Sequence, residues 1–259
     1  MSYLGSIGVV TGAASGMGEI IASRMAKQGM QVAALDVDES KLKNLSRKYN
    51  NIRTFLCDVA NYEQVKKTIQ EIESTLGEID SLVHAAAIMP AKPILKTLPK
   101  ETMQLMEVNY GGTVNLTHSI IPKMLQKNSG QAVFFGSIAG NVLNTGLAPY
   151  SSTKSAVNTY IEILQQEVKD SEVHIMLVEP NAVDTPLIDQ ALGKDGPKNI
   201  KESKKTGRLA DPLKIVKSIE KGLERKKTIL YPNFEAKILA LARRFFPKLL
   251  WSVILKSNK

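Results

Sequence analysis

Tyr150 and Lys154 are the two residues of this chain whose types and spacing point most directly to chemistry. Side chains four residues apart lie on the same face of a helix, one turn from each other. Pro149 tolerates a first helical turn, so we expect a helix to begin there. The Lys154 ammonium is expected to lower the pKa of Tyr150 from its usual value of about 10, which would permit proton exchange near neutrality. A surface pair without a catalytic role is the alternative.

A glycine-rich loop near the N-terminus has the composition of a phosphate-binding turn. The segment Thr11–Gly18 follows an apolar stretch at 6–11 and precedes an amphipathic helical pattern. Gly12, Gly16 and Gly18 would let backbone amides approach a pyrophosphate at the N-terminus of that helix. Their spacing, G-x-x-x-G-x-G, departs from the general G-x-G-x-x-G fingerprint. A glycine turn that serves only tight packing is therefore the alternative.

Two carboxylates follow the next two apolar stretches. Asp36 ends the stretch 31–35, and Asp58 follows the stretch 52–56. A carboxylate at Asp36 can accept hydrogen bonds from the adenosine ribose hydroxyls and would repel a 2′-phosphate, which favours NAD over NADP. Asp58 is a candidate contact for the adenine amino group. Helix capping is the alternative for both residues, and Asp38 would serve as a cap as well.

The elements that must position these residues alternate regularly along the chain. Strands are expected at 6–11, 31–35, 52–56, 80–85, 131–135, 173–178 and 228–231, with helices after residue 18 and near 39–49, 61–76, 101–126, 150–169 and 211–225. Strands that alternate with helices and lack hairpin signals imply βαβ units. We therefore predict an α/β fold: a single-domain, Rossmann-type, doubly wound parallel sheet of about seven strands over residues 1–232, with a C-terminal amphipathic helical extension.

In combination, these motifs resemble the short-chain dehydrogenase/reductase family. The matching residues stand in the order of the family and at roughly its spacing, over about residues 5–232: they are Thr11–Gly18, Asp36, Cys57-Asp58-Val59, Asn109, Ser137 and Tyr150–Lys154. Each motif is weak alone, and the series makes coincidence improbable.

The resemblance implies a role for each matching residue. Tyr150 would be the general acid/base, while Lys154 would bind the nicotinamide ribose and hold down the pKa of the tyrosine. Ser137 would hydrogen-bond the substrate oxygen, and Asn109 would anchor a water in a proton relay to Lys154. Taken alone, a turn serine and a structural helical asparagine are the alternatives. The implied cofactor contacts are Gly12, Ser15, Gly16, Met17, Gly18, Asp36, Asp58, Val59, Ala85, Tyr150, Lys154, Val183 and Thr185.

The chain departs from the family pattern in two places. Members often have Asn-Asn-Ala-Gly after the fourth strand, where this chain has His84-Ala85-Ala86-Ala87; we interpret His84 as structural. The Pro-Gly after the sixth strand is here Pro180-Asn181. Because Asn tolerates the left-handed conformation, we expect that turn to survive, with Val183 and Thr185 against the nicotinamide carboxamide.

Charge is unevenly distributed. The chain has 259 residues and a net charge of +9, but residues 1–191 carry a net −3 and residues 192–259 a net +12. This pattern argues against a nucleic-acid-binding domain and favours a local basic patch. Cys57 is the single cysteine, which excludes an internal disulfide and a cysteine metal cluster. With no signal peptide and no spanning stretch recognised, we expect a cytoplasmic protein.

Two segments are expected to select the substrate. Residues 184–210 contain Gly193, Gly196, Pro197 and several lysines, a composition typical of a mobile loop or lid. In residues 233–259, apolar and aromatic residues alternate with basic ones, and Pro247 should divide the segment into two amphipathic helices. Such a tail is typical of peripheral membrane contact. Packing on the core or on a second subunit is the alternative.

These features predict an NAD-dependent oxidoreductase that moves a hydride between the nicotinamide and a secondary alcohol or ketone, without a metal. The apolar residues Leu187, Ile188 and Leu192 suggest a hydrophobic, lipid-like or steroid-like substrate. An NADP-dependent ketoreductase and a non-catalytic dinucleotide-binding regulatory protein are the alternatives. The family resemblance further implies a homodimer or homotetramer.

Overall fold

Seven parallel strands form a single sheet in the computed structural model, which describes residues 2–257. Their order is β3-β2-β1-β4-β5-β6-β7, and every neighbouring pair is parallel. The predicted doubly wound, single-domain α/β fold is thereby confirmed. The strands are β1 (Ile7–Thr11), β2 (Gln31–Asp36), β3 (Ile52–Leu56), β4 (Ser81–His84), β5 (Gly130–Phe135), β6 (Val173–Val178) and β7 (Ile229–Leu230).

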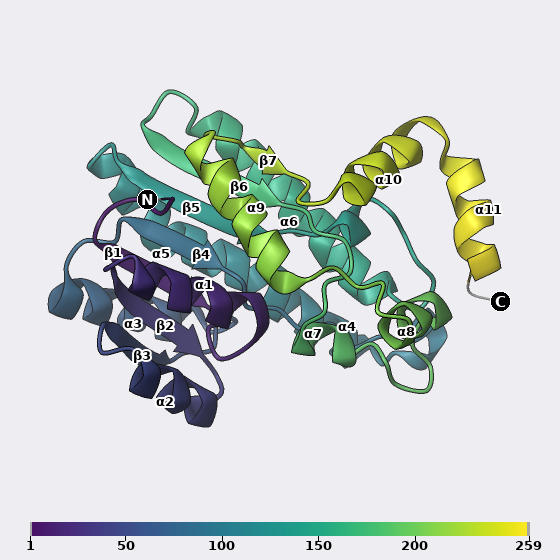
Figure 1. Cartoon of the computed structure of the whole chain (residues 1–259), viewed down its shortest axis with the longest axis horizontal. Helices are drawn as coiled ribbons and strands as arrows, with labels where there is room; N and C mark the ends of the chain where they lie inside the picture. Colours follow the sequence, from purple (N-terminus) through teal and green to yellow (C-terminus); the bar gives the residue numbers. More distant parts are fainter. Residues whose placement is uncertain (1, 258–259) are drawn as a thin grey trace.

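Helices cover both faces of this sheet (Figure 1). One apolar cluster joins the sheet to α1 (Gly16–Lys27), α2 (Glu39–Lys48) and α9 (Pro212–Glu224). A second joins the opposite face to α3 (Tyr62–Leu76), α5 (Gly112–Gln126) and α6 (Ala148–Glu167). Successive strand residues alternate between the two clusters, as when Val133 joins the first and Phe134 the second. Burial on both faces explains why the strands read as continuous apolar runs.

The strand order reverses between β1 and β4, which lie side by side although β2 and β3 intervene in sequence. In such a sheet the crevice outside the carboxyl ends of these two strands is the expected ligand site. Thr11 and His84 end the two strands in register. The glycine loop follows β1, so the fold places it directly at this crevice.

The helix expected over 101–126 is interrupted. It consists of α4 (Pro99–Leu105), a π-helical turn η2 (Met106–Gly111) and α5. The Thr113 hydroxyl of α5 donates a hydrogen bond to the carbonyl oxygen of Asn109 in this turn at 2.8 Å. Wide turns of this kind are frequent at functional sites, and this one carries Asn109. Two short 3₁₀ turns, η1 (Ile94–Lys96) and η3 (Ile138–Gly140), complete this half of the chain.

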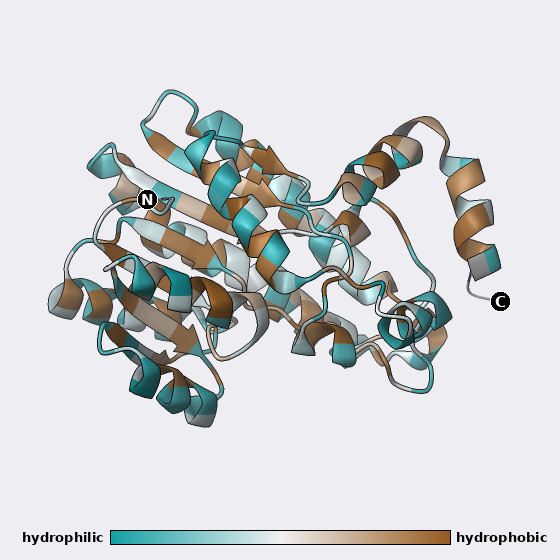
Figure 2. Cartoon of the chain, in the orientation of Figure 1, coloured by the Kyte–Doolittle hydropathy of each residue, from teal (hydrophilic) through white to brown (hydrophobic). Residues whose placement is uncertain are grey.

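The segment 184–210 contains α7 (Pro186–Asp189) and α8 (Lys198–Lys205), and a bridge between Val183 and Ala210 closes its base. After β7, the predicted break at Pro247 is confirmed: α10 (Phe234–Phe245) and α11 (Pro247–Ser257) form an arm beyond the sheet (Figure 1). Figure 2 shows that apolar residues occur along both helices of this arm. Within residues 2–257, no helix combines the length and apolar character needed to cross a lipid bilayer.

Candidate active site

Tyr150 and Lys154 lie in the first two turns of α6, where Pro149 stands as predicted. Both side chains are buried. The Lys154 ammonium donates a hydrogen bond to the Phe135 carbonyl oxygen at 2.6 Å and lies 5.8 Å from the centre of the Tyr150 ring. The end of β5 therefore holds the lysine beside the tyrosine, so the pair is not a coincidence of surface residues.

Burial opposes the pKa shift that the sequence suggested for Tyr150. Removal from water raises the pKa of Tyr150 to about 12, although a hydrogen bond with Ser137 lowers it in part. Burial also lowers the pKa of Lys154 to about 8. The expectation that Lys154 lowers the pKa of Tyr150 to near neutrality is thus wrong for the protein chain alone. Burial penalises the charged form of both residues, and for Tyr150 this effect raises the pKa. The tyrosine is a neutral proton donor in this site.

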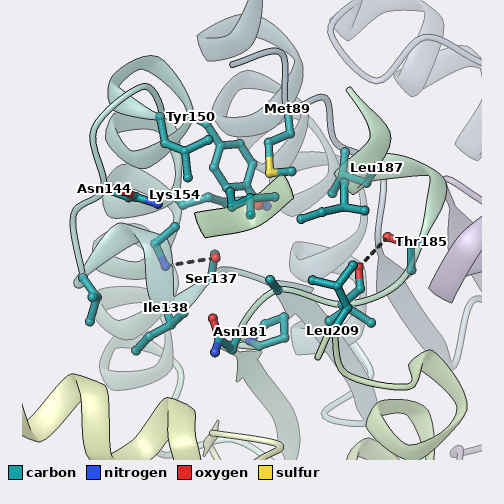
Figure 3. A pocket seen from close by; sticks show the side chains of 18 of the residues that line it. Met89, Ser137, Ile138, Asn144, Tyr150, Lys154, Asn181, Thr185, Leu187 and Leu209 are labelled. Atoms are coloured by element: carbon teal, nitrogen blue, oxygen red, sulfur yellow. Dashed lines mark hydrogen bonds between the residues drawn. The ribbon is translucent and has the colours of Figure 1, made fainter. Parts of the chain in front are cut away.

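Ser137 follows β5 and caps the short turn η3. Its hydroxyl oxygen accepts a hydrogen bond from the Ala139 amide at 3.0 Å, and the same hydroxyl group contacts the Tyr150 side chain. Figure 3 shows Ser137, Tyr150 and Lys154 converging on one pocket. A hydroxyl beside the proton donor can hold a substrate oxygen next to it.

Asn158 and Glu179 fix the backbone of Ser137, and the sequence analysis missed both. The Asn158 carboxamide accepts a hydrogen bond from the Ser137 amide at 3.3 Å and donates to the Ser137 carbonyl at 3.1 Å. It also donates to Glu179 Oε2 at 3.0 Å. Burial, with the charge of Glu162 adding to it, raises the pKa of Glu179 to about 7. Asn158 stands four residues after Lys154, and that spacing was the available signal.

Asn109 forms hydrogen bonds close to Lys154, but its side chain does not line the cavity that contains Tyr150. Its side-chain oxygen accepts from the Ile88 amide at 2.9 Å, and its nitrogen donates to the Ile88 carbonyl and to Thr153 Oγ1, both at 3.0 Å. Asn109 thus ties the segment after β4 to α6, next to Lys154. The water relay to Lys154 stays a prediction.

The glycine loop has the shape that a dinucleotide requires. A Cβ atom on Gly18 would lie 2.1 Å from the Gly12 carbonyl oxygen, and one on Gly12 would lie 2.8 Å from the Ala86 amide nitrogen. Only glycine permits these close approaches, so the loop packs tightly and keeps the N-terminus of α1 open. The Ser15 side chain makes no capping hydrogen bond there. The first amides of α1 are therefore available to an anion.

The three aspartates near this loop make different hydrogen bonds. Asp38 caps α2 by accepting a hydrogen bond from the Lys41 amide, which removes the capping alternative for Asp36. The Asp36 carboxylate accepts from the Ala14 amide at 3.0 Å and from the Val37 amide at 2.8 Å. Asp58 accepts from the Ala60 amide at 3.0 Å, while Asn61 caps α3.

The predicted cofactor residues gather around one cleft of about 450 Å³. It adjoins a second cavity of about 600 Å³ that contains Ser137, Tyr150 and Lys154. Val183 lines only the second cavity, and Met17, Ala85 and Thr185 line both, so the two spaces meet there. The predicted residues along the first cleft are Gly12, Ser15, Gly16, Met17, Gly18, Asp36, Asp58, Val59, Ala85 and Thr185. The long cleft and its glycine loop fit a dinucleotide whose reactive ring lies near the junction.

The cavity walls beyond the catalytic residues are mostly apolar. In Figure 3, Met89 lies beside the Tyr150 ring, whereas Leu187 and Leu209 lie across the pocket from Ser137. The tail also contributes: Glu235 and Leu239 of α10 and Ile254 of α11 line this cavity. Further apolar lining residues are Ile138, Val142, Leu147, Ile188 and Ile200.

The two departures from the family pattern are structural. His84 is buried, and its Nδ1 atom shares a hydrogen bond with Thr11 Oγ1 at 2.7 Å. Burial and the charge of Lys154 lower the pKa of His84 to about 3, so the ring is neutral. At Pro180-Asn181 the left-handed conformation is not used: among the described residues, the only positive φ angles outside glycine are at Asn128 and Lys226. Asn181 therefore keeps an ordinary backbone conformation.

The family model for the short chain dehydrogenase matches residues 6–195 of this chain. The chain therefore belongs to the short-chain dehydrogenase/reductase family and is a dinucleotide-binding oxidoreductase. The fold, the glycine loop and the Ser137, Tyr150 and Lys154 constellation agree with this membership.

Particular relatives are found in bacteria and animals. An uncharacterized oxidoreductase of Staphylococcus saprophyticus is 31% identical over 206 residues, which cover 76% of this chain and 88% of its own. The dehydrogenase/reductase SDR family member 7B of Xenopus laevis is 26% identical over 257 residues, or 95% and 80% of the two chains. A solved short-chain dehydrogenase/reductase from Burkholderia phymatum, in complex with NAD, superimposes with a TM-score of 0.86 at 20% identity over 96% of each chain.

Proposed function

We propose that this protein interconverts secondary alcohols and ketones with NAD(H), and that its substrates are hydrophobic. The observation that carries the proposal is the junction of the two spaces, where Ser137 and Tyr150 face a largely apolar cavity beside the dinucleotide cleft. A bound nicotinamide supplies or accepts the hydride.

The residues of the chain handle the proton and the substrate oxygen. In the reductive direction the Tyr150 hydroxyl donates its proton to the carbonyl oxygen as negative charge develops there. The Ser137 hydroxyl donates a hydrogen bond to the same oxygen and fixes its position. The Lys154 ammonium lies close enough to stabilise the phenolate that remains. In the oxidative direction the phenolate takes the proton from the alcohol.

Asp36 supports NAD as the cofactor. Its carboxylate stands at the end of β2 on the wall of the cleft, where a 2′-phosphate would meet a negative charge. Lys41 also lines this cleft and favours the NADP alternative, but it forms an ion pair with Asp38 at 2.8 Å. The NAD complex of the Burkholderia phymatum protein is consistent with the same choice.

The apolar lining supports a lipid-like or steroid-like substrate. A cavity of about 600 Å³ falls within the usual range for small-molecule sites. Its aliphatic walls would desolvate a hydrocarbon skeleton, while Tyr150 and Ser137 would hold the oxygen that reacts. Short polar alcohols would leave most of this lining exposed to water and should react poorly.

The test combines cofactor binding with turnover. Calorimetric titration with NADH and NADPH measures the cofactor preference directly, and nicotinamide absorbance follows oxidation of a series of secondary alcohols of increasing chain length. We expect tighter binding of NADH and rates that rise with chain length. Equal or tighter binding of NADPH would overturn the cofactor assignment.

Tyr150→Phe separates the enzyme from a dinucleotide-binding regulatory protein. Loss of the hydroxyl should reduce turnover by at least about 10²-fold, because the proton donor is gone. NADH affinity should stay unchanged, since the ring is retained. Unchanged turnover in the variant would refute the assigned role. Cofactor binding without any turnover by the wild-type chain across the series would favour the regulatory alternative.

A further inference from the structure

The two C-terminal helices present continuous apolar stripes to solvent. In α10 the stripe consists of Phe234, Ile238, Leu241 and Phe245, which recur at steps of four, three and four residues and are 77, 48, 50 and 65% exposed. In α11 the residues Leu249 and Val253 continue the pattern one turn apart, after Phe246 between the helices. Exposed apolar side chains that adjoin one another in this way are typical of an interaction site.

The opposite faces of the same helices belong to the protein interior. Ala236 and Leu250 are buried, and Leu239 and Ile254 line the catalytic cavity. Each helix is therefore placed by its inner face, so the outer stripe is not free to turn inward. The arm is a wall of the cavity whose outer surface lacks an apolar partner within the described chain.

Charge identifies the kind of partner that this outer surface fits. Residues 233–259 contain six basic residues and one acidic residue, a net charge of +5. Lys237, Lys248 and Lys256 are exposed on the two helices. Basic side chains interleaved with exposed Phe and Leu are typical of helices that lie in the headgroup region of anionic lipid. A second copy would bring two such basic arms together, which the like charges oppose.

We propose that α10 and α11 dock on an anionic lipid surface, with the apolar stripes inserted between the headgroups and the lysines on the lipid phosphates. This docking does not require the proposed activity. Its consequence is that one wall of the catalytic cavity lies against the membrane. The membrane would then be the source of the apolar substrates of the proposed activity.

Vesicle sedimentation of the full chain tests the proposal. The protein should pellet with phosphatidylcholine vesicles that contain about one third phosphatidylglycerol, and much less with phosphatidylcholine alone. Binding should weaken when salt is raised from about 0.1 M to about 1 M, because the Debye length falls from about 10 Å to about 3 Å. Tyr150→Phe should bind vesicles as the wild type does, which separates this result from the fate of the proposed function. No pelleting with the anionic vesicles, or equal pelleting with both kinds, would overturn the proposal.

Two matched charge-reversal variants assign the binding to the arm. Lys237→Glu combined with Lys248→Glu should weaken vesicle binding about tenfold or more, because each lysine near an anionic surface contributes to binding. Lys66→Glu combined with Lys67→Glu changes the net charge equally at exposed positions on α3 and should bind as the wild type does. Equal losses in the two variants would mean that vesicle binding depends only on the net charge of the protein, and would overturn the proposal.

A third variant addresses the apolar stripe. Phe234→Ser combined with Phe245→Ser changes two exposed side chains and should weaken vesicle binding about tenfold or more, without a change in oligomeric mass. The mass is measured by light scattering in the absence of lipid. A wild-type dimer that this variant dissociates would assign the surface to a second copy of the chain and overturn the proposal.

Discussion

Lys154 and Tyr150 have opposite pKa shifts with the same cause, since burial disfavours the charged form of each side chain. Reduction of a ketone needs a neutral Tyr150 and a charged Lys154. Because burial raises the pKa of Tyr150 to about 12 and lowers that of Lys154 to about 8, the lysine loses its proton first.

The pH dependence of reduction should therefore report Lys154. The value of kcat/KM for NADH reflects groups of the free enzyme. We expect it to be flat between about pH 6 and 7 and to fall up to about tenfold per pH unit above 8. Stopped-flow or steady-state rates across this range provide the measurement. A profile that stays flat to pH 10 would contradict a role for the charged lysine.

His84 should limit the acid stability of the fold. Burial holds the pKa of His84 in the folded state at about 3, whereas the ring in the unfolded chain has its ordinary pKa of 6.5. The unfolded state thus takes up the proton first as the pH falls. Below about 6.5 the free energy of unfolding should decrease by up to about 1.4 kcal/mol per pH unit from this residue, until about pH 3.

His84→Asn provides the comparison. Asn does not titrate in this range and is short enough to keep a hydrogen bond to Thr11 Oγ1. Urea unfolding of both proteins between pH 7 and 4 should therefore show a shallower loss of stability in the variant. Parallel curves would mean that His84 is already protonated in the folded protein.

At the scale of elements, the end of β5, the end of β6 and α6 meet through Asn158. One carboxamide pairs with both backbone groups of Ser137 and with Glu179, so it sets the position of the Ser137 hydroxyl relative to Tyr150. Asn158 lines neither of the two cavities and is a positioning residue.

Asn158→Ala should lower kcat by about ten- to 100-fold while leaving the KM for NADH unchanged, because Ser137 shifts away from the substrate oxygen. The buried groups left unpaired should also cost about 1–3 kcal/mol of stability. Glu179→Gln keeps an oxygen that can accept from Asn158 and should retain most of the activity. A loss of stability in Asn158→Ala without any loss of kcat would reduce the residue to a structural role.

At the scale of the whole molecule, the catalytic cavity is assembled from parts that are far apart in sequence. Met89 follows β4, Leu187 belongs to α7, Leu209 follows α8, and Leu239 and Ile254 come from the tail. The tail is therefore part of the cavity wall as well as a surface element. This arrangement leaves the dinucleotide cleft independent of the tail.

Leu239→Ala combined with Ile254→Ala should raise the KM for a bulky apolar alcohol by at least about tenfold, because each truncation removes apolar contacts worth about 1–3 kcal/mol. The KM for the cofactor should not change. Leu241→Ala combined with Val253→Ala truncates exposed side chains of the same helices and should leave both constants unchanged in a lipid-free assay. Equal effects of the two pairs would contradict the assignment of inner and outer faces.

Much of the fold followed from local patterns. The alternation of apolar strands and amphipathic helices predicted the parallel sheet, and the glycine loop and Asp36 predicted where the dinucleotide cleft lies. Tyr150, Lys154 and Ser137 were predicted as a set and lie together. Periodicity and motif spacing are properties of short segments, and short segments determine the elements and their order along the sheet.

The remainder depended on contacts between distant segments. The π turn at Asn109, the contact of Asn158 with Glu179 and the cavity contacts of α10 and α11 follow from no local pattern. The pKa of Tyr150 was misjudged for the same reason: spacing reveals a neighbouring lysine, but only the packed structure shows how completely both groups are removed from water. The sequence by itself determined the family and the order of the elements, whereas tertiary packing decided the electrostatics of the site and the walls of the cavity, because burial is a property of the assembled chain.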